Sequence, residues 1–380
     1  MSAGRQSGRR SRSGRSGVRG AGRGIRRGRG GVRRPKSVSG RASAPALAAS
    51  SAARLAAAPA PAASSQYTRQ AFEEARRRIS PEAHVTPVVR CRSLSERAGF
   101  DLALKCENLQ RGGAFKFRGA FHMISALSAA ERARGVITYS SGNHAQAVAL
   151  AARLHRIRAT VVMPEDAAGV KLAATRGQGA EVIQHGRTPQ ERMALAHRLA
   201  ERRGLTMVPP YEDPRILLGQ GTILLEILEQ EPQTQVVLVP VGGGGLLGGI
   251  CAAVRAFRVP IEVYGVEPEA ADDWARSIEA GRIVSIGASP TIADGLRSLE
   301  PGKVPFPIVR EVVKGIIRVS EREIREATLL LLTRAKIVAE PSGAVPVAAA
   351  LFHADLLRGR RRVLAVVSGG NVDPEALARL

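Results

Sequence analysis

The sequence predicts an α/β protein whose mostly parallel sheet is covered by helices on both faces. From residue 67 onwards, short apolar runs alternate with helix-length segments, which is the pattern of buried parallel strands joined by crossover helices. With 380 residues and 44% hydrophobic content, the chain is long enough for one large core or for two lobes that share a cleft. Strands are expected at residues 102–107, 135–140, 159–164, 236–242, 262–267 and 363–369.

Residues 1–66 differ in composition from the rest of the chain. They contain 15 Arg or Lys and no acidic residue, which leaves +9 of the formal net charge of +24 for the remainder. Such a Gly-, Ser-, Ala- and Pro-rich segment cannot bury a core, so we expect it to be disordered. It could be a nucleic-acid-binding arm, a targeting peptide, or upstream sequence translated from an early start codon. Because no aromatic residue precedes Tyr67, only nonspecific binding to nucleic acid is expected.

Two further features of the sequence indicate where in the cell the protein is expected. No apolar run approaches the roughly 20 residues that span a bilayer, so a membrane protein is not expected. Cys91, Cys106 and Cys251 are far apart and in no paired spacing, which argues against a disulfide framework or a zinc site. We therefore expect a cytoplasmic protein.

Small-residue turns follow three of the expected strands. They read SSGNH at 140–144, GGGG at 242–245 and SGGN at 368–371. Ligands of parallel sheets bind beyond the carboxyl ends of the strands, and a glycine loop that opens a helix offers amides to an anion. These turns predict a phosphate pocket. A dinucleotide site is the alternative, because Gly243, Gly245 and Gly248 satisfy GxGxxG and Glu267 lies 22 residues beyond Gly245.

Lys116 is a candidate nucleophile. It is one of only six lysines outside the tail and lies between Phe115 and Phe117. An apolar setting lowers the pKa of a lysine toward roughly 7 to 8 and frees its lone pair. The alternative is a solvated lysine on a helix face.

Seven motifs of this chain resemble those of the fold-type II pyridoxal-phosphate enzymes, in their serine/threonine dehydratase and serine racemase branch. In order, the motifs are KCENLQRGGAFKFRGA, TYSSGNHAQA, VPVGGGGLLGG, GVEPEAADD, TIADG, EPSGA and VSGGNVD. The resemblance covers residues 67–380. It implies a tryptophan synthase β-like fold of two parallel-sheet α/β lobes with pyridoxal 5'-phosphate in the cleft between them. The large lobe would comprise residues 67–134 and 213–380, and the small lobe residues 135–212.

The resemblance also implies roles for individual residues. Lys116 would bind the cofactor covalently and act as catalytic base, the glycine loop would hold the phosphate, and Ser368 would face the pyridine nitrogen. The implied cofactor-binding set is Lys116, Phe115, Asn143, Gly242, Gly243, Gly244, Gly245 and Ser368. The implied substrate-binding set is Ser140, Ser141, Asn143, His144, Arg198 and Ser298.

Two of these residues have an alternative interpretation, and one further position departs from the family's sequence pattern. Ser141 would be a second catalytic acid/base, as in racemases, although a helix N-cap is an equal interpretation. Arg198 has weaker motif support and could be a surface residue. Ala114 stands where many relatives have serine.

A divalent cation site is implied by GVEPEAADD. Its ligands would be the carboxylates of Glu267 and Asp273 and the backbone carbonyl of Ala271, and hard oxygen donors suit Mg²⁺, or Ca²⁺ or Mn²⁺. This match moves Glu267 from a ribose to a metal. A solvated acidic turn is the alternative interpretation.

The activity implied is elimination from L-threonine and/or L-serine, which gives 2-oxobutanoate or pyruvate plus ammonia. Serine racemase or 3-hydroxyaspartate dehydratase on the same scaffold is the alternative. An NAD-dependent dehydrogenase and an RNA-binding protein with a degenerate enzyme domain are more distant. The family implies a homodimer. Since the sequence ends shortly after VSGGNVD, no regulatory domain and no feedback inhibition by isoleucine are expected.

Overall fold

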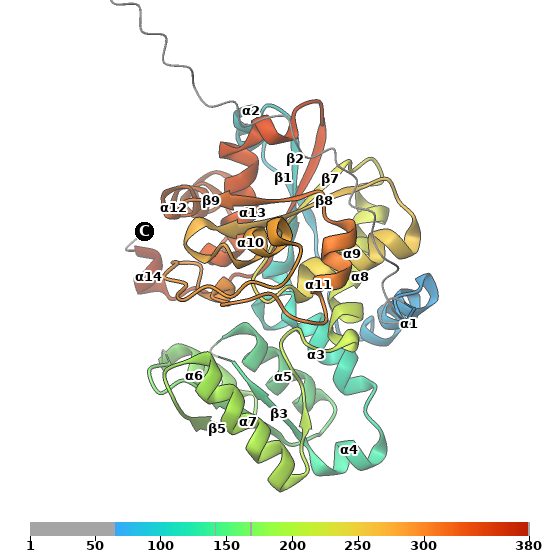
Figure 1. The fold of residues 1–380 in the computed structure, drawn as a ribbon, viewed down its shortest axis with the longest axis vertical. Helices are drawn as coiled ribbons and strands as arrows, with labels where there is room; N and C mark the ends of the chain where they lie inside the picture. Colours follow the sequence, from blue (N-terminus) through green and yellow to red (C-terminus); the bar gives the residue numbers. More distant parts are fainter. Residues whose placement is uncertain (1–64, 141, 168, 379–380) are drawn as a thin grey trace, which may run out of the picture. The chain divides into compact units, whose positions relative to one another are not determined.

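The computed structural model describes residues 65–378 except 141 and 168, and these form two sheets flanked by helices (Figure 1). The predicted basic tail lies almost entirely outside the described residues. The six-stranded sheet has the order β1-β2-β10-β7-β8-β9 and contains β1 (Val88–Arg90), β2 (Asp101–Cys106), β7 (Val236–Pro240), β8 (Glu262–Pro268), β9 (Gly315–Val319) and β10 (Arg362–Val367). The four-stranded sheet has the order β5-β4-β3-β6 and contains β3 (Val136–Tyr139), β4 (Ala159–Met163), β5 (Glu181–Gln184) and β6 (Thr206–Met207).

The helices lie between and beside these strands. They are α1 (Arg69–Ile79), α2 (Arg92–Ala98), α3 (Lys116–Ser125), α4 (Ala129–Arg134), α5 (Asn143–Leu154), α6 (Gly169–Gly177), α7 (Pro189–Arg203), α8 (Pro214–Gln230), α9 (Gly245–Phe257), α10 (Asp273–Ala280), α11 (Phe306–Val312), α12 (Glu321–Leu330), α13 (Pro341–Phe352) and α14 (Pro374–Ala378). None of them is long and apolar enough to cross a membrane. The three cysteines are free thiols.

All strand pairs are parallel except that of β1 with β2. This confirms the predicted α/β class. The single sheet suggested by strand alternation alone was wrong, because the strands between residues 136 and 207 pair only with one another. Alternation of apolar runs identifies strands but not their partners, since pairing depends on contacts distant in sequence.

The large sheet is buried on both faces. Along β10, Val363, Ala365 and Val367 face one core, which also contains α2, α12 and α13. Leu364 and Val366 face the other core, with α8 and α9. Successive side chains of a strand point to opposite faces, so a continuous apolar run such as VLAVV fits a strand covered on both sides.

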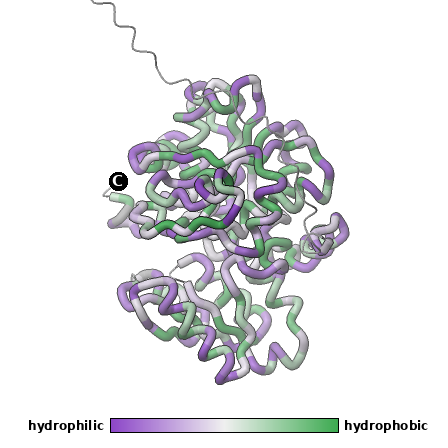
Figure 2. Tube along the Cα trace, viewed as in Figure 1, coloured by the Kyte–Doolittle hydropathy of each residue, from purple (hydrophilic) through white to green (hydrophobic). Residues whose placement is uncertain are grey.

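The small sheet is covered in the same way. Val136 packs with α3 and α5 on one face, whereas Ile137 and Val162 pack with α7 on the other. Both parts of the described chain contain hydrophobic stretches, drawn in green in Figure 2. This arrangement brings the start of α5 and the loop after β3 to the side of the small sheet that faces α3.

Four strands were not predicted. β1, β5 and β6 have two to four residues, and the side chains of β5 are only partly buried or exposed. β9 reads GIIRV, and its glycine and arginine interrupt the apolar run. Short or interrupted runs carry little periodic signal.

Candidate active site

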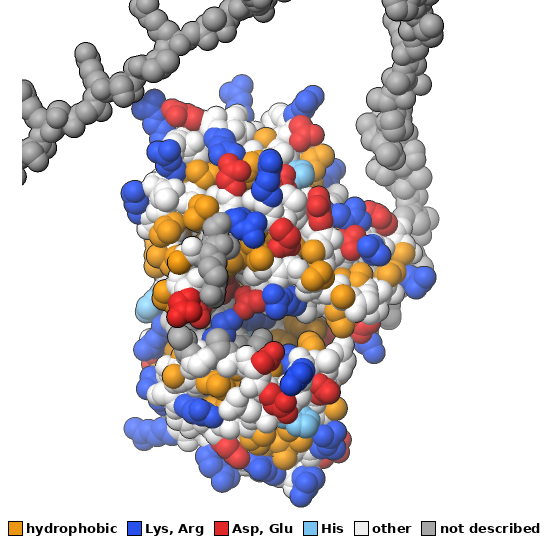
Figure 3. All heavy atoms as spheres, turned by 90° about the vertical axis from the view of Figure 1, so that its left-hand side faces the viewer, with side chains coloured by type: hydrophobic (Ala, Val, Ile, Leu, Met, Phe, Trp, Pro, Cys, Tyr) orange, Lys and Arg blue, Asp and Glu red, His pale blue; other side chains and the backbone are white. Residues whose placement is uncertain are grey.

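A cavity of about 550 Å³ lies where the carboxyl ends of strands from both sheets meet. Its wall includes the residues that follow β3, β7 and β10, which are the three small-residue turns singled out in the sequence. On the face of the molecule drawn in Figure 3, basic and acidic side chains lie close together along the middle. Residues predicted to bind one ligand therefore share one cavity.

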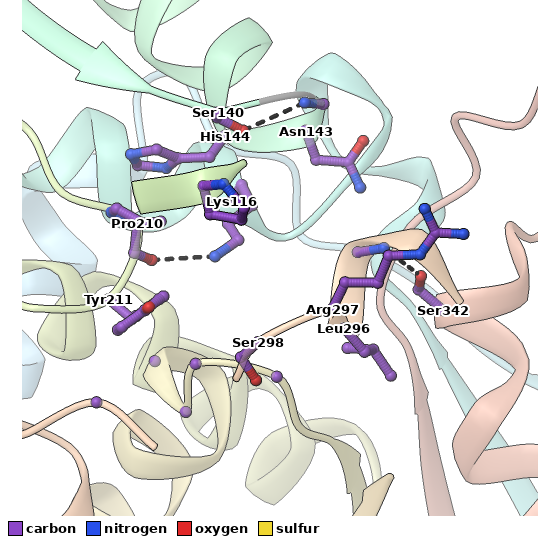
Figure 4. A pocket seen from close by; sticks show the side chains of 18 of the residues that line it. Lys116, Ser140, Asn143, His144, Pro210, Tyr211, Leu296, Arg297, Ser298 and Ser342 are labelled. Carbon is purple, nitrogen blue, oxygen red and sulfur yellow. Dashed lines mark hydrogen bonds between the residues drawn. The ribbon is translucent and has the colours of Figure 1, made fainter. Parts of the chain in front are cut away.

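Lys116 is the first residue of α3 and points into this cavity (Figure 4). Its Nζ donates a hydrogen bond to the carbonyl of Pro210 at 3.0 Å and lies 5.1 Å from the centroid of the Phe115 ring. Burial lowers the pKa of Lys116 to about 8, because removal from water disfavours the charged amine. Phe117 is buried in the core beside Phe121.

Two backbone hydrogen bonds hold residues 113–115, which precede Lys116, against the loop after β10. The Phe115 amide donates to the carbonyl of Ser368 at 3.0 Å, and the Gly370 amide donates to the carbonyl of Gly113 at 2.9 Å. Ser368 is itself buried and lines the cavity. These two bonds fix the positions of Lys116 and Ser368 relative to each other.

A buried ion network supports α3 from below. Arg118 donates to Glu107 at 2.8 Å and to Glu226 at 2.6 Å, and Lys105 donates to Glu226 at 2.6 Å. All four side chains are buried. Two positive and two negative charges pair fully, which avoids an uncompensated buried charge. The network joins β2, α3 and α8.

The glycine loop between β7 and α9 leaves little room for side chains. Gly244 has a φ of +96°, a conformation that residues with a Cβ rarely adopt. A Cβ on Gly243 would collide with the ring of Tyr211. The loop leads directly into α9, whose first amides have no intrahelical partner. Residues 242–245 thus offer amides and a helix N-terminus to an anion, and they fit a phosphate group.

Asn143 and His144 begin α5 and also line the cavity. His144 Nε2 lies 3.0 Å from the carbonyl of Val208. A carbonyl only accepts, so Nε2 carries the proton and Nδ1 is an acceptor; Nδ1 has no partner among the described residues. Burial and the nearby Lys116 lower the pKa of His144 to about 3. Ser140 Oγ accepts from the Gly142 amide at 3.2 Å.

Three predicted substrate residues differ in their placement. Ser298 lines the cavity and donates to Asp273 at 3.2 Å. Arg198 is exposed on α7 and is absent from the cavity wall. Ser141 lies outside the described residues.

The predicted metal ligands lie around the start of α10. Both carboxylate oxygens of Glu267 accept backbone hydrogen bonds, from Trp274 at 3.1 Å and Ala275 at 2.8 Å. Glu267 is fully buried. Burial raises the pKa of Glu267 to about 8 and that of Asp273 to about 7. Ala271 ends the 3-10 turn Glu269–Ala271, which lies between Glu267 and Asp273 in the chain.

The cavity wall also contains residues that were not predicted from the sequence, among them Arg192, Tyr211 and Glu340. Arg192 on α7 is only 8% exposed, and its Nε has no hydrogen-bond partner among the described residues. Tyr211 packs against the glycine loop, and Glu340 is a buried carboxyl. Glu340 belongs to the quoted motif EPSGA and could have been found there, whereas Arg192 and Tyr211 belong to none.

Comparisons with known proteins agree with this geometry. A family model described as pyridoxal-phosphate dependent enzyme matches residues 79–369. The L-threo-3-hydroxyaspartate ammonia-lyase of Saccharomyces cerevisiae is 43% identical over 81% of this chain and 94% of that enzyme. The L-threonine ammonia-lyase of Thermotoga maritima is 43% identical over 82% of this chain and 78% of that enzyme. The structure of maize serine racemase has a TM-score of 0.79 and 38% identity, covering 82% of this chain and 97% of that one.

Proposed function

Because the chain belongs to the pyridoxal-phosphate dependent enzymes and has their fold-type II architecture, we propose that it deaminates a small hydroxy amino acid. The β-hydroxyl leaves as water, and water then hydrolyses the released enamine to a 2-keto acid and ammonia. The substrates would be L-threonine, L-serine or both, and the products 2-oxobutanoate or pyruvate. This is a carbon–nitrogen lyase activity. Relatives of this chain that are named ammonia-lyases have an activity of the same class.

The observation that carries this proposal is the part-buried Lys116 amine, with its lowered pKa, in one cavity with the glycine loop and Ser368. Lys116 would hold the cofactor aldehyde with Phe115 beside it, Gly242, Gly243, Gly244 and Gly245 its phosphate, Asn143 its 3'-oxygen and Ser368 its pyridine nitrogen. When bound, the cofactor supplies an electron sink next to the α-carbon of the substrate.

Two side chains would direct the reaction. The Lys116 amine, with its lowered pKa, is suited to take the α-proton at Nζ. The Ser368 hydroxyl, unlike a carboxylate, cannot keep a proton on the pyridine nitrogen, so the electron sink stays weak. A weak sink favours elimination over transamination.

The start of α5 would bind the substrate carboxylate. Its amides point toward the cavity end of the helix, as helix N-termini do for anions. Ser140 and neutral His144 add an oxygen and an unpartnered Nδ1 to this wall. A racemase activity would need Ser141 as a second acid/base.

A dicarboxylic substrate, 3-hydroxyaspartate, is a second candidate. The observation that favours it is Arg192, a buried cation in the cavity wall with no ion-pair partner among the described residues. A buried guanidinium gains from a carboxylate partner, and the second carboxylate of such a substrate would be one. Two relatives carry this activity in their names, at 43% and 45% identity.

Further parts of the assignment rest on the family resemblance. We propose that the six-stranded sheet belongs to the large lobe and the four-stranded sheet to the small one. Glu267, Asp273 and the carbonyl of Ala271 would bind a divalent cation that pairs with two buried acids. We also propose a homodimer and a cytoplasmic location.

A product assay tests the proposed activity. Purified protein supplied with cofactor is incubated with serine, threonine and L-threo-3-hydroxyaspartate, and 2-keto acid and ammonia are measured. We expect equal amounts of both products from at least one substrate, and none from Lys116→Ala. Absence of keto acid from all three substrates, with the cofactor bound, would overturn the proposal.

A further inference from the structure

The carboxamide of Asn143 is held at both of its polar atoms. Its Nδ2 donates to Glu340 Oε1 at 2.7 Å, and its Oδ1 accepts from Asn371 Nδ2 at 2.9 Å. Asn371 Nδ2 also donates to the carbonyl of Gly112 at 2.7 Å. An amide with an acceptor at its nitrogen and a donor at its oxygen cannot flip without losing both bonds.

Glu340 is itself fixed by the backbone around it. It is the N-cap residue of α13, and its carbonyl accepts from Gly343 at 2.8 Å and Ala344 at 3.1 Å. Its amide donates to the carbonyl of Gly369 at 3.1 Å, in the loop that carries Ser368. A Cβ on Gly369 would lie 2.5 Å from Glu340 Oε1, so the carboxyl lies close against the backbone of Gly369.

We propose that Glu340 is a positioning residue that, together with Asn371, orients Asn143 so that its second Nδ2 hydrogen serves the 3'-oxygen of the cofactor. This inference rests on the proposed function. Nδ2 carries two hydrogens, and Glu340 takes one of them. Asn143 begins α5, which follows β3, Glu340 caps α13, and Asn371 follows β10. The contact therefore joins both sheets at the cavity.

The protonation of Glu340 agrees with this role. Burial raises the pKa of Glu340 to about 8, so the neutral acid is the main form at neutral pH. A neutral carboxyl still accepts the hydrogen bond from Asn143 through its carbonyl oxygen. It also keeps a negative charge away from the electron-rich 3'-oxygen.

Cofactor titration of variants tests the inference without turnover. Apoprotein is titrated with pyridoxal phosphate, and two quantities are recorded: the dissociation constant and the ratio of the visible to the near-ultraviolet band. Asn143→Ala is the reference for complete loss. Glu340→Ala should shift the band ratio in the same direction and weaken binding about five- to tenfold, the factor for one lost hydrogen bond.

Three further variants sharpen the result. Glu340→Gln keeps an acceptor oxygen and should restore both quantities to within about twofold of wild type, again judged on the scale of one hydrogen bond. Asn371→Ala removes the other restraint and should shift the band ratio as well. Asn108→Ala is the matched control, since its Nδ2 also bonds a backbone carbonyl, that of Val338, but it does not line the cavity.

The outcomes separate the two proposals. A band ratio unchanged in both Glu340→Ala and Asn371→Ala, with normal thermal unfolding, would overturn the positioning role alone. Glu340→Gln as damaged as Glu340→Ala would also overturn it, because the carboxyl would then act by its proton rather than by placing Asn143. Wild-type protein that binds no cofactor would overturn the proposed function together with this inference.

Discussion

Burial changes the proton affinities of the amine of Lys116 and the carboxyl of Glu340 in opposite directions. The pKa of Lys116 falls to about 8 and that of Glu340 rises to about 8, because each charged form loses its water. Near neutral pH this setting favours a neutral carboxyl and makes a neutral amine accessible. The cavity can therefore hold a doubly charged phosphate at the glycine loop without a second negative charge at Glu340.

The lowered pKa of Lys116 predicts how cofactor capture depends on pH. Only the neutral amine attacks an aldehyde, so the rate should rise with pH and level off above about 8. Stopped-flow absorbance of apoprotein mixed with pyridoxal phosphate measures this rate, with Nα-acetyl-lysine as a reference for the titration of the cofactor itself. A rate relative to that reference that does not change with pH would mean an ordinary lysine.

Arg192 predicts substrate preference. Arg192→Met should lower kcat/KM for 3-hydroxyaspartate by about 10- to 100-fold, the range for one charge-assisted hydrogen bond of 1.5–3 kcal/mol, and change that for serine by less than about threefold. Arg198→Met is the matched control, because Arg198 is exposed on the same helix. Equal losses with both substrates would remove the argument for a dicarboxylate.

Among single residues, most of those predicted from motifs reach the cavity, whereas Glu340 was missed although it lies in the motif EPSGA. Lys116, Asn143, Ser368 and the glycine loop all reach the cavity wall. Arg192 was missed and Arg198 was chosen, because which side of α7 faces the cavity depends on how that helix packs against the small sheet. No local pattern contains that information.

At the scale of elements, close packing of α3, α8 and α9 connects Lys116 to the glycine loop. A Cβ on Gly219 of α8 would lie 2.6 Å from the carbonyl oxygen of Arg118, and one on Gly249 of α9 would lie 2.5 Å from that of Leu217. Backbones that approach so closely leave no room for a methyl group. A displacement of one of these helices would therefore affect the positions of both Lys116 and the glycine loop.

Gly249→Ala tests this packing. Overpacking should lower the free energy of unfolding by about 1–3 kcal/mol, measured by urea denaturation, and should also weaken cofactor binding. Gly177→Ala is the control, since a Cβ on Gly177 at the end of α6 would meet nothing within 4 Å. A Gly249→Ala protein as stable as Gly177→Ala would show that the helices can separate at no cost.

For the elements themselves, the sequence predicted the long buried strands well. Six of the ten described strands were expected within about two residues, in the range where periodicity is informative. The edge strands β1, β5 and β9 were missed, because an edge strand is covered on fewer sides and its sequence is less continuously apolar. The two-residue β6 has no pattern to detect.

In the molecule as a whole, two sheets meet at one cavity, and the acidic pair Glu267 and Asp273 lies beside its wall. Glu267 and Asp273 are buried with raised pKa values, and Ser298 connects Asp273 to the cavity wall. A bound cation would favour the ionised form of both carboxyl groups. It would stabilise the loop that carries Ser298.

A divalent cation should therefore stabilise the protein. Mg²⁺ or Ca²⁺ at about 100 times its dissociation constant should add about 2.7 kcal/mol to the free energy of unfolding, seen as a higher thermal midpoint. Asp273→Asn should lose most of this gain. A thermal midpoint that does not respond to either cation in wild-type protein would contradict the proposed site.

The division into two sheets could not be predicted from the pattern of residues alone. Apolar alternation predicted the class, but only the motif resemblance implied two lobes. Strand order is set by contacts between residues far apart, such as β10 beside β2 and β7. Those contacts cannot be read from any single segment.

Reduction with borohydride followed by peptide mass spectrometry shows which lysine binds the cofactor. Borohydride makes the bond between a lysine and the cofactor aldehyde permanent, so the modified peptide identifies the lysine. We expect one phosphopyridoxyl group, on the peptide that contains Lys116, and none in Lys116→Ala. A label on the buried Lys105 or on Lys171, which also lines the cavity, or no label on cofactor-saturated protein, would mean that Lys116 is not the cofactor lysine.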